Sequence, residues 1–158
     1  MEFKEKLREY AKLIVQVGVN VQENQVCFLW SDVDSAPLTR LIADEAYNTG
    51  AKIVHVNYVD MLVKQLTFQR AADEVFKIYP EWNKLMNEQL RDEGACFIYI
   101  DSTDPDLLAG VPAGRIANDR KARGVALKSF DQSLSAGHNC WTVACAANVV
   151  WCEQSISK

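Results

Sequence analysis

The sequence predicts a three-layer α/β/α domain built around a mainly parallel sheet. Short runs rich in β-branched and aromatic residues alternate along the chain with segments of helical character, an order typical of α/β folds. The 158 residues suffice for one sizeable core and leave little room for a second. No internal repeat, low-complexity tract or linker divides the chain, so we expect residues 1–158 to form a single domain.

The first element is predicted to be an amphipathic helix. Apolar side chains recur in its sequence at spacings of four and three, which places them on one stripe: Phe3, Leu7, Tyr10, Ile14 and Val17. Gly18 and Asn20 provide a C-terminal stop. The short apolar run QVCFLWS that follows indicates a buried strand.

Residues 25–58 are predicted to form a strand, a crossover helix and a second strand. Asp32, Asp34 or Ser35 can cap the helix, Pro37 lies in its first turn and Gly50 closes it. The run AKIVHVNYV then indicates another apolar strand. Such a unit forms a right-handed parallel pair.

The second half of the chain continues the alternation. Residues 60–94 favour two or three helical pieces interrupted at Pro80, and ACFIYI indicates a third buried strand. A turn-rich connector follows, in which Asp104-Pro105 begins a short helical turn. Residues 115–128 are predicted to be helical, and residues 141–146 to form a fourth strand.

Charge and composition exclude several classes of partner and location. Lys and Arg total 17 against 21 Asp and Glu, a formal charge of -4, so the chain lacks the basic surplus that nucleic-acid binding requires. No run approaches the ~18 apolar residues of a membrane span. The first residues show no export signal, and an odd cysteine count with Cys27 and Cys96 in apolar runs favours reduced thiols. We therefore expect a cytoplasmic protein that contacts neither nucleic acid nor membrane.

The first strand-to-helix turn does not have the composition of a nucleotide site. WSDVDSAP carries Asp32 and Asp34 where a phosphate cradle needs glycines and free backbone donors. AGVPAGR contains glycines, but it does not directly follow a strand and has no Walker lysine. His55, between two valines of a strand, is interpreted as a hydrogen-bonded structural histidine rather than a catalytic base.

Two charged segments allow both a structural and a functional interpretation. A basic stretch is either an anion-facing patch or, as we favour, the solvated face of a helix: Arg115, Arg120, Lys121, Arg123 and Lys128. Asp101, Asp104 and Asp106 follow a strand, where α/β active sites commonly lie. Acidic residues are also common in turns because they bond their own backbone, which is the interpretation we favour here.

The stretch HNCWTVACAANVVWC raises the question of a metal site. Its potential ligands are His138, Cys140, Cys145 and Cys152. In a strand over residues 141–147, Cys140 and Cys145 have opposite parity and point to opposite faces, so they cannot converge on one ion without a bulge. We favour a last strand whose cysteines fill the core.

Five segments together resemble one known family. YAKLIVQVGVNVQENQ, GAKIVHVNY, IYPEWNK, DPDLLAGV and KARGVALK occur in the order and spacing of the N-terminal portion of the thermophilic-type metalloaminopeptidases, the aminopeptidase T and aminopeptidase S type. The resemblance extends from about Phe3 to Trp151. Where that family usually has prolines before a tryptophan, this sequence has ACAANVVWC.

The resemblance implies a domain of a larger enzyme. In that family two divalent metal ions, zinc or cobalt, lie in a C-terminal domain, and they activate the water that removes the N-terminal residue of a peptide. The ligands would all lie beyond Lys158. No catalytic, cofactor-binding or metal-binding residue is therefore assigned here, and the chain alone is expected to be catalytically silent. Peptide substrates and a homodimer are expected of the parent enzyme.

A second hypothesis is a stand-alone α/β binding module for a peptide or small anion. Its ligand would contact the loops at the carboxyl ends of the strands, near Asp32, Asp34, Asp101 and Asp104.

Overall fold

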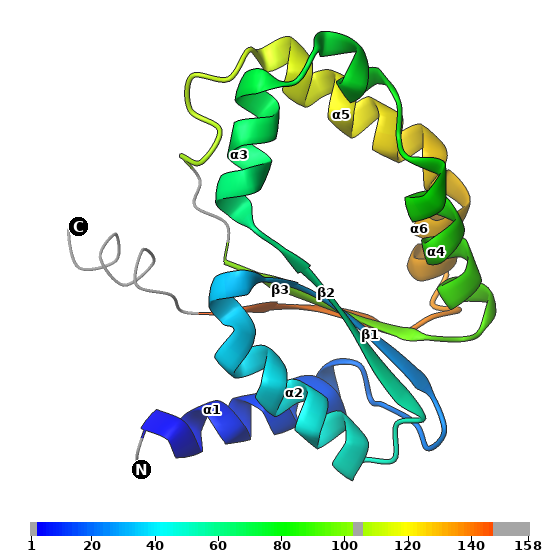
Figure 1. Ribbon diagram of the computed structural model, residues 1–158. Coiled ribbons are helices and arrows are strands. Elements are labelled where there is room, and N and C mark those ends of the chain that lie inside the picture. Colours follow the sequence, from blue (N-terminus) through cyan, green and yellow to red (C-terminus); the bar gives the residue numbers. More distant parts are fainter. Residues whose placement is uncertain (1–2, 103–105, 147–158) are drawn as a thin grey trace.

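The computed structural model describes residues 3–102 and 106–146, which form a four-stranded parallel sheet with helices on both faces (Figure 1). The strands are β1 (Val26–Asp32), β2 (Ile53–Val59), β3 (Cys96–Asp101) and β4 (Trp141–Cys145), in the order β2-β1-β3-β4. All three neighbouring pairs are parallel. The predicted three-layer α/β/α class is confirmed.

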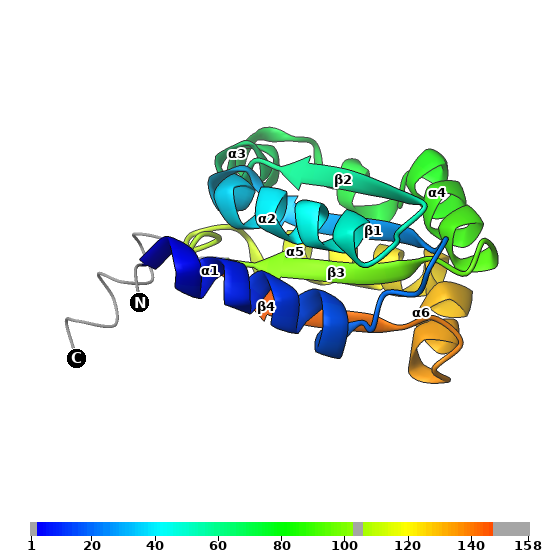
Figure 2. The ribbon, with the colours of Figure 1, turned by 90° about the horizontal axis from the view of Figure 1, so that it is seen from below.

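The N-terminal helices cover one face of the sheet. They are α1 (Phe3–Lys12), η1 (Leu13–Gly18) and, between β1 and β2, α2 (Ala36–Asn48). Figure 2 views this side and shows α1 and α2 side by side in front of the strands. The larger apolar cluster lies here, with Val15, Leu29, Ile42 and Ile98 almost fully buried. The predicted first helix is confirmed, although its last turn is a π-helix.

An aromatic cluster fills the space between the other face and two helices, α4 (Glu81–Asp92) and α6 (Lys128–Ser135). Phe97 packs edge-to-face on Phe130 with ring centroids 5.0 Å apart, and on Phe28 at 6.2 Å. This edge-to-face geometry places the positive ring edge on the negative ring face. Trp30, Tyr79 and Tyr99 close the cluster toward solvent.

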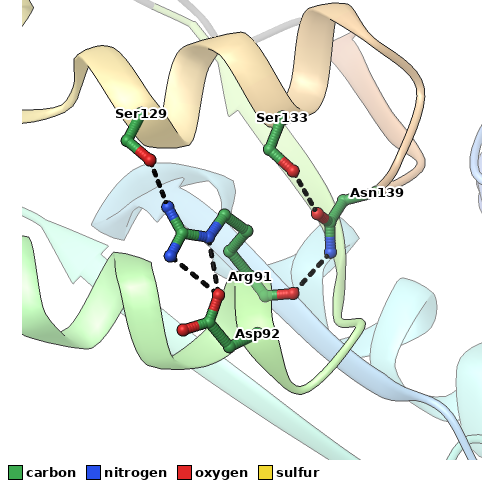
Figure 3. A network of polar contacts seen from close by, with 5 residues as sticks. All are labelled: Arg91, Asp92, Ser129, Ser133 and Asn139. Atoms are coloured by element: carbon green, nitrogen blue, oxygen red, sulfur yellow. Dashed lines mark hydrogen bonds and ion pairs between the residues drawn. The ribbon is translucent and has the colours of Figure 1, made fainter.

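A polar network joins α4, α6 and the turn before β4 (Figure 3). Arg91 donates to Asp92 at 2.7 Å and to Ser129 at 2.8 Å. The buried Asn139 amide donates to the carbonyls of Arg91 and Ala95, and its oxygen accepts from Ser133. These bonds add side-chain donors to backbone carbonyls at and just after the end of α4.

An outer arch stands above this second face, made of α3 (Met61–Arg70), η3 (Asp73–Lys77) and α5 (Ala113–Ala126) (Figure 1). Arg115 joins all three parts: it donates to the Phe68 carbonyl and to Asp73, both at 2.7 Å, and lies 5.5 Å from the ring centre of Phe76. Phe76 in turn stacks on Phe68. The interpretation of the basic stretch as a solvated face is therefore wrong for Arg115, whose half-buried side chain connects α3, η3 and α5. It is also incomplete for Arg123, which pairs with Asp131 of α6 at 3.2 Å.

Several predicted boundaries and environments differ from the structure. The helix predicted over residues 115–128 is confirmed as α5, but it ends at Ala126, because Leu127 turns the chain and inserts into the aromatic cluster; α6, which follows, was not predicted. The apolar strand around His55 is an edge strand whose side chains are half-buried or exposed. The turn predicted at Asp104-Pro105 lies outside the described residues.

Cys27 and Cys96 are register partners at the centre of the sheet, and both are completely buried. Both are free thiols, as predicted. A hydrogen bond to Cys96, together with burial, raises the pKa of the Cys27 thiol. No helix among residues 3–102 and 106–146 has the length and apolar character needed to cross a membrane.

The two groups of cysteines should react differently with an alkylating reagent. Only the exposed thiolate is nucleophilic, so we expect iodoacetamide to modify Cys140 and Cys145 in the native chain and to leave Cys27 and Cys96 intact. Peptide mass spectrometry after brief labelling measures this, with the guanidinium-unfolded chain as control. Native labelling of Cys27 at the rate of Cys140 would contradict the buried pair.

The aromatic cluster should make stability fall at high pH. Burial raises the pKa of Tyr99 to about 12, so between pH 10 and 12 the unfolded phenol loses a proton that the folded phenol keeps. We expect this group to lower the free energy of unfolding by up to roughly 2 kcal/mol across that window, because a tenfold change in proton affinity is worth about 1.4 kcal/mol. Urea unfolding at several pH values measures the slope, which Tyr99→Phe should reduce.

Tyr58→Phe is the matched control, because it removes a phenol that is 42% exposed on the edge strand β2. If the two variants show the same pH slope as each other, Tyr99 does not carry the effect.

Candidate functional site

The strand order creates one switch point, the place where an open parallel sheet can bind a ligand. From β1 the chain crosses to β2 on one side, whereas β3 lies on the other, so the carboxyl ends of β1 and β3 flank the point where the order reverses. Ligands of open α/β sheets bind at such switch points. Asp32 and Ser35 lie at the end of β1 here, and Ser102 follows β3.

The Asp32 carboxylate is committed to hydrogen bonds within the fold. Its side chain is buried, and Oδ1 accepts from the Ser35 backbone N–H at 2.8 Å. Its Oδ2 accepts from the Ser35 hydroxyl at 2.9 Å and from the Ser102 hydroxyl. Asp32, one of the three residues that the sequence offered as cap, thus caps the short 3₁₀ turn η2 (Val33–Ser35) that leads into α2, whereas Ser35 occupies the N-cap position of α2 itself.

A second layer of hydroxyl groups supports this arrangement. The hydroxyls of Ser31 and Thr39 lie 2.8 Å apart, and Thr39 donates to the Ser35 carbonyl at 3.0 Å. All three side chains are buried. Because the lone pairs of Asp32 point toward protein donors, its oxygens have little capacity left for a ligand. The geometry therefore favours a structural role for Asp32 over a ligand-binding one.

The other acidic residues of the predicted binding loops do not converge with Asp32. Asp34 and Asp101 are exposed, and Asp104 lies outside the described residues. Carboxylates at this edge would repel a phosphate or another small anion. The binding-module hypothesis remains a prediction, and Asp32, one of its four named residues, is bonded within the fold at this edge.

His55 is not the hydrogen-bonded structural histidine that the sequence suggested. Its side chain is exposed on β2, and it forms no hydrogen bond with the residues that the structure describes. The reason is the position of β2 at the edge of the sheet, which the local sequence does not reveal.

The sequence predicted that the cysteines near the C-terminus belong to a last strand and fill the core, and only the strand is confirmed. Residues Trp141–Cys145 do form the last described strand, as predicted. Cys140 and Cys145 are exposed, however, so the prediction that they fill the core is wrong; β4 is an edge strand, and one of its faces has little cover. His138 is also exposed, and Cys152 lies outside the described residues.

These residues do not form a metal site in the described part of the chain. Among residues 3–102 and 106–146, no three His, Cys, Asp or Glu side chains lie together so that they could hold a metal ion. The donors needed for a divalent ion are therefore not assembled here, and we derive no metal-dependent step from these residues.

A groove of about 530 Å³, which no sequence pattern indicated, lies between the segment after η3 and the second half of α5. Ile78, Tyr79 and Val125 give it an apolar wall, and Lys77 and Lys121 border it. Burial raises the pKa of Tyr79, against the opposing effect of Arg123. None of the eight lining residues is a carboxylate, cysteine or histidine, so the groove offers apolar surface, two amines and a phenol.

Comparisons with known proteins agree over nearly the whole chain. The thermophilic metalloprotease (M29) family matches residues 3–157. Aminopeptidase AmpS of Bacillus subtilis is 41% identical over 152 residues, which are 96% of this chain and 37% of AmpS. Aminopeptidase 2 of Geobacillus stearothermophilus is 36% identical over the same shares of each chain.

The fold agrees with a solved structure as well. Wild-type AmpT from Thermus thermophilus superposes with a TM-score of 0.88 at 26% identity, over 96% of this chain and 38% of that one. The chain thus spans less than two-fifths of the length of the relatives that it matches. With its family match, relatives and fold in agreement, the chain belongs to the thermophilic metalloprotease (M29) family.

Proposed function

We propose that this chain is the N-terminal domain, without metal ligands, of a metal-dependent aminopeptidase that removes N-terminal amino acids from peptides. The observation that carries the proposal is the share of each relative that this chain matches. Aminopeptidases match 96% of this chain but are covered only to 37% of their own length, so most of each relative lies outside the matched part. That unmatched part is long enough to form at least one further domain.

The side chains of the described residues support the part of the proposal that assigns metal binding to the rest of the parent enzyme. Two-metal hydrolases hold their ions about 3.5–4 Å apart with several carboxylate and imidazole ligands. The described residues assemble no such cluster, and the carboxylate at the switch point is bonded internally. We therefore assign the metal ions, zinc or cobalt, to the part of the parent enzyme outside this chain, and propose that the chain alone is silent.

The location and assembly of the parent enzyme are part of the same proposal. Cys27 and Cys96 face each other as free thiols, which suits the reducing conditions of the cytoplasm. Peptides are the proposed substrates, and the homodimer expected from the resemblance is retained for the parent enzyme.

The purified chain should neither bind catalytic metal nor hydrolyse peptides. With zinc or cobalt added, we expect no release of p-nitroaniline from aminoacyl-p-nitroanilides and no stoichiometric metal by elemental analysis after desalting. AmpS of Bacillus subtilis, treated in the same way, is the positive control. Peptidase turnover that co-elutes with the folded chain through two different columns would disprove the proposed silence.

A further inference from the structure

Among the described residues, no strand pairs with the outer side of β4. β4 is the last strand in the sheet order, paired with β3 on one side. The Phe97 N–H donates to the Cys140 carbonyl at 3.0 Å, and this bond determines which backbone groups of β4 point toward β3. Because backbone groups alternate in direction along a strand, those of Trp141, Val143 and Cys145 point away from β3.

A side chain from α1 confirms this direction. Tyr10 donates its hydroxyl to the Cys145 carbonyl at 3.2 Å, from the side that β3 does not occupy. The π-helix η1, which continues α1 and carries Leu13 and Val17, packs against β4, with Gly18 beside the Thr142 side chain.

Large apolar side chains therefore flank the open edge on both faces of the sheet. Trp141 and Val143, 48% and 54% exposed, lie on the face that bears α4 and α6. Leu13 and Val17, 55% and 71% exposed, lie on the opposite side. Exposed apolar side chains grouped at one edge are typical of an interaction site.

β4 also lacks the features that keep an edge strand unpaired. Natural edges carry charges, prolines or bulges, which discourage the addition of another strand. The strand WTVAC has no charge and no proline. The other edge strand, β2, also has no charge or proline within IVHVNYV, but it contains the polar residues His55 and Asn57 and is flanked by the charged residues Lys52 and Asp60.

We propose that the open edge of β4, flanked by Leu13, Val17, Trp141 and Val143, is the surface on which the remainder of the aminopeptidase polypeptide docks, by adding a strand beside β4 and covering both apolar flanks. This inference rests on the proposed function. The relatives supply the occupant, since AmpS continues for most of its length outside the matched part. A segment of the same polypeptide is present at high effective concentration, which favours it over a second copy or a free peptide.

The isolated chain tests whether the edge is open. By hydrogen exchange, the outward amides of Trp141 and Val143 should exchange rapidly, while the inward amides of Thr142 and Ala144 are protected. Sedimentation should show a monomer. Protection of all four amides in a monomer would overturn the proposal, as would a dimer that Val143→Lys dissociates, because the edge would then belong to a second copy.

A hybrid enzyme tests the occupant. This chain replaces the matched part of Bacillus subtilis AmpS, with and without Val143→Lys. A lysine under an added strand is buried without a partner, so we expect the melting temperature of the hybrid to fall by roughly 4 °C or more. In the isolated chain the same substitution should leave the circular dichroism spectrum and melting temperature unchanged.

Val56→Lys is the matched control, the same substitution on the opposite edge strand at a residue 37% exposed. Equal shifts for the two variants in the hybrid would overturn the docking surface.

The outcomes separate the docking surface from the proposed function. A folded hybrid without peptidase activity would refute the proposed function, while its melting temperatures would still show whether β4 is covered. A hybrid that does not fold under conditions where AmpS does would refute both.

Discussion

The carboxylate of Asp32 joins parts of the chain that are distant in sequence. It ends β1, caps the turn that leads into α2 through Ser35, and accepts from Ser102, seventy residues later, where β3 ends. The two central strands are thereby tied together at their carboxyl ends, as Cys27 and Cys96 pack together nearer their beginnings. A buried carboxylate is stable only when such donors surround it, so the position of each of these elements depends on the others. At the position where this fold usually binds a ligand, Asp32 instead connects the ends of β1 and β3 and the turn that leads into α2.

The sequence predicted the interior of this fold better than its margins. β1 and β3 are buried on both faces, and a continuous apolar run is what such a strand requires. β2 and β4 have similar composition, but the strand order places them at the edges, so His55, Cys140 and Cys145 are exposed rather than packed. No local pattern carries that information, because edge position is decided by pairings across the whole chain.

The same limit applies to the candidate site. The capping role of Asp32 follows from its place before Pro37, and it could be anticipated. Its bond to Ser102 and the contacts of Arg115 with Phe68 and Asp73 join residues more than forty positions apart, and no spacing rule predicts them. The family resemblance was visible in the sequence because it depends on segments in order rather than on contacts, and the comparisons bear it out.

The arch of α3, η3 and α5 has a consequence for cooperativity. The helices on the two faces of the sheet are held by buried apolar clusters, whereas the arch depends largely on one guanidinium and two stacked rings. Regions with few buried contacts open at a lower free energy than the global unfolding of a protein. We therefore expect a change at Arg115 to loosen the arch while the parallel sheet stays intact.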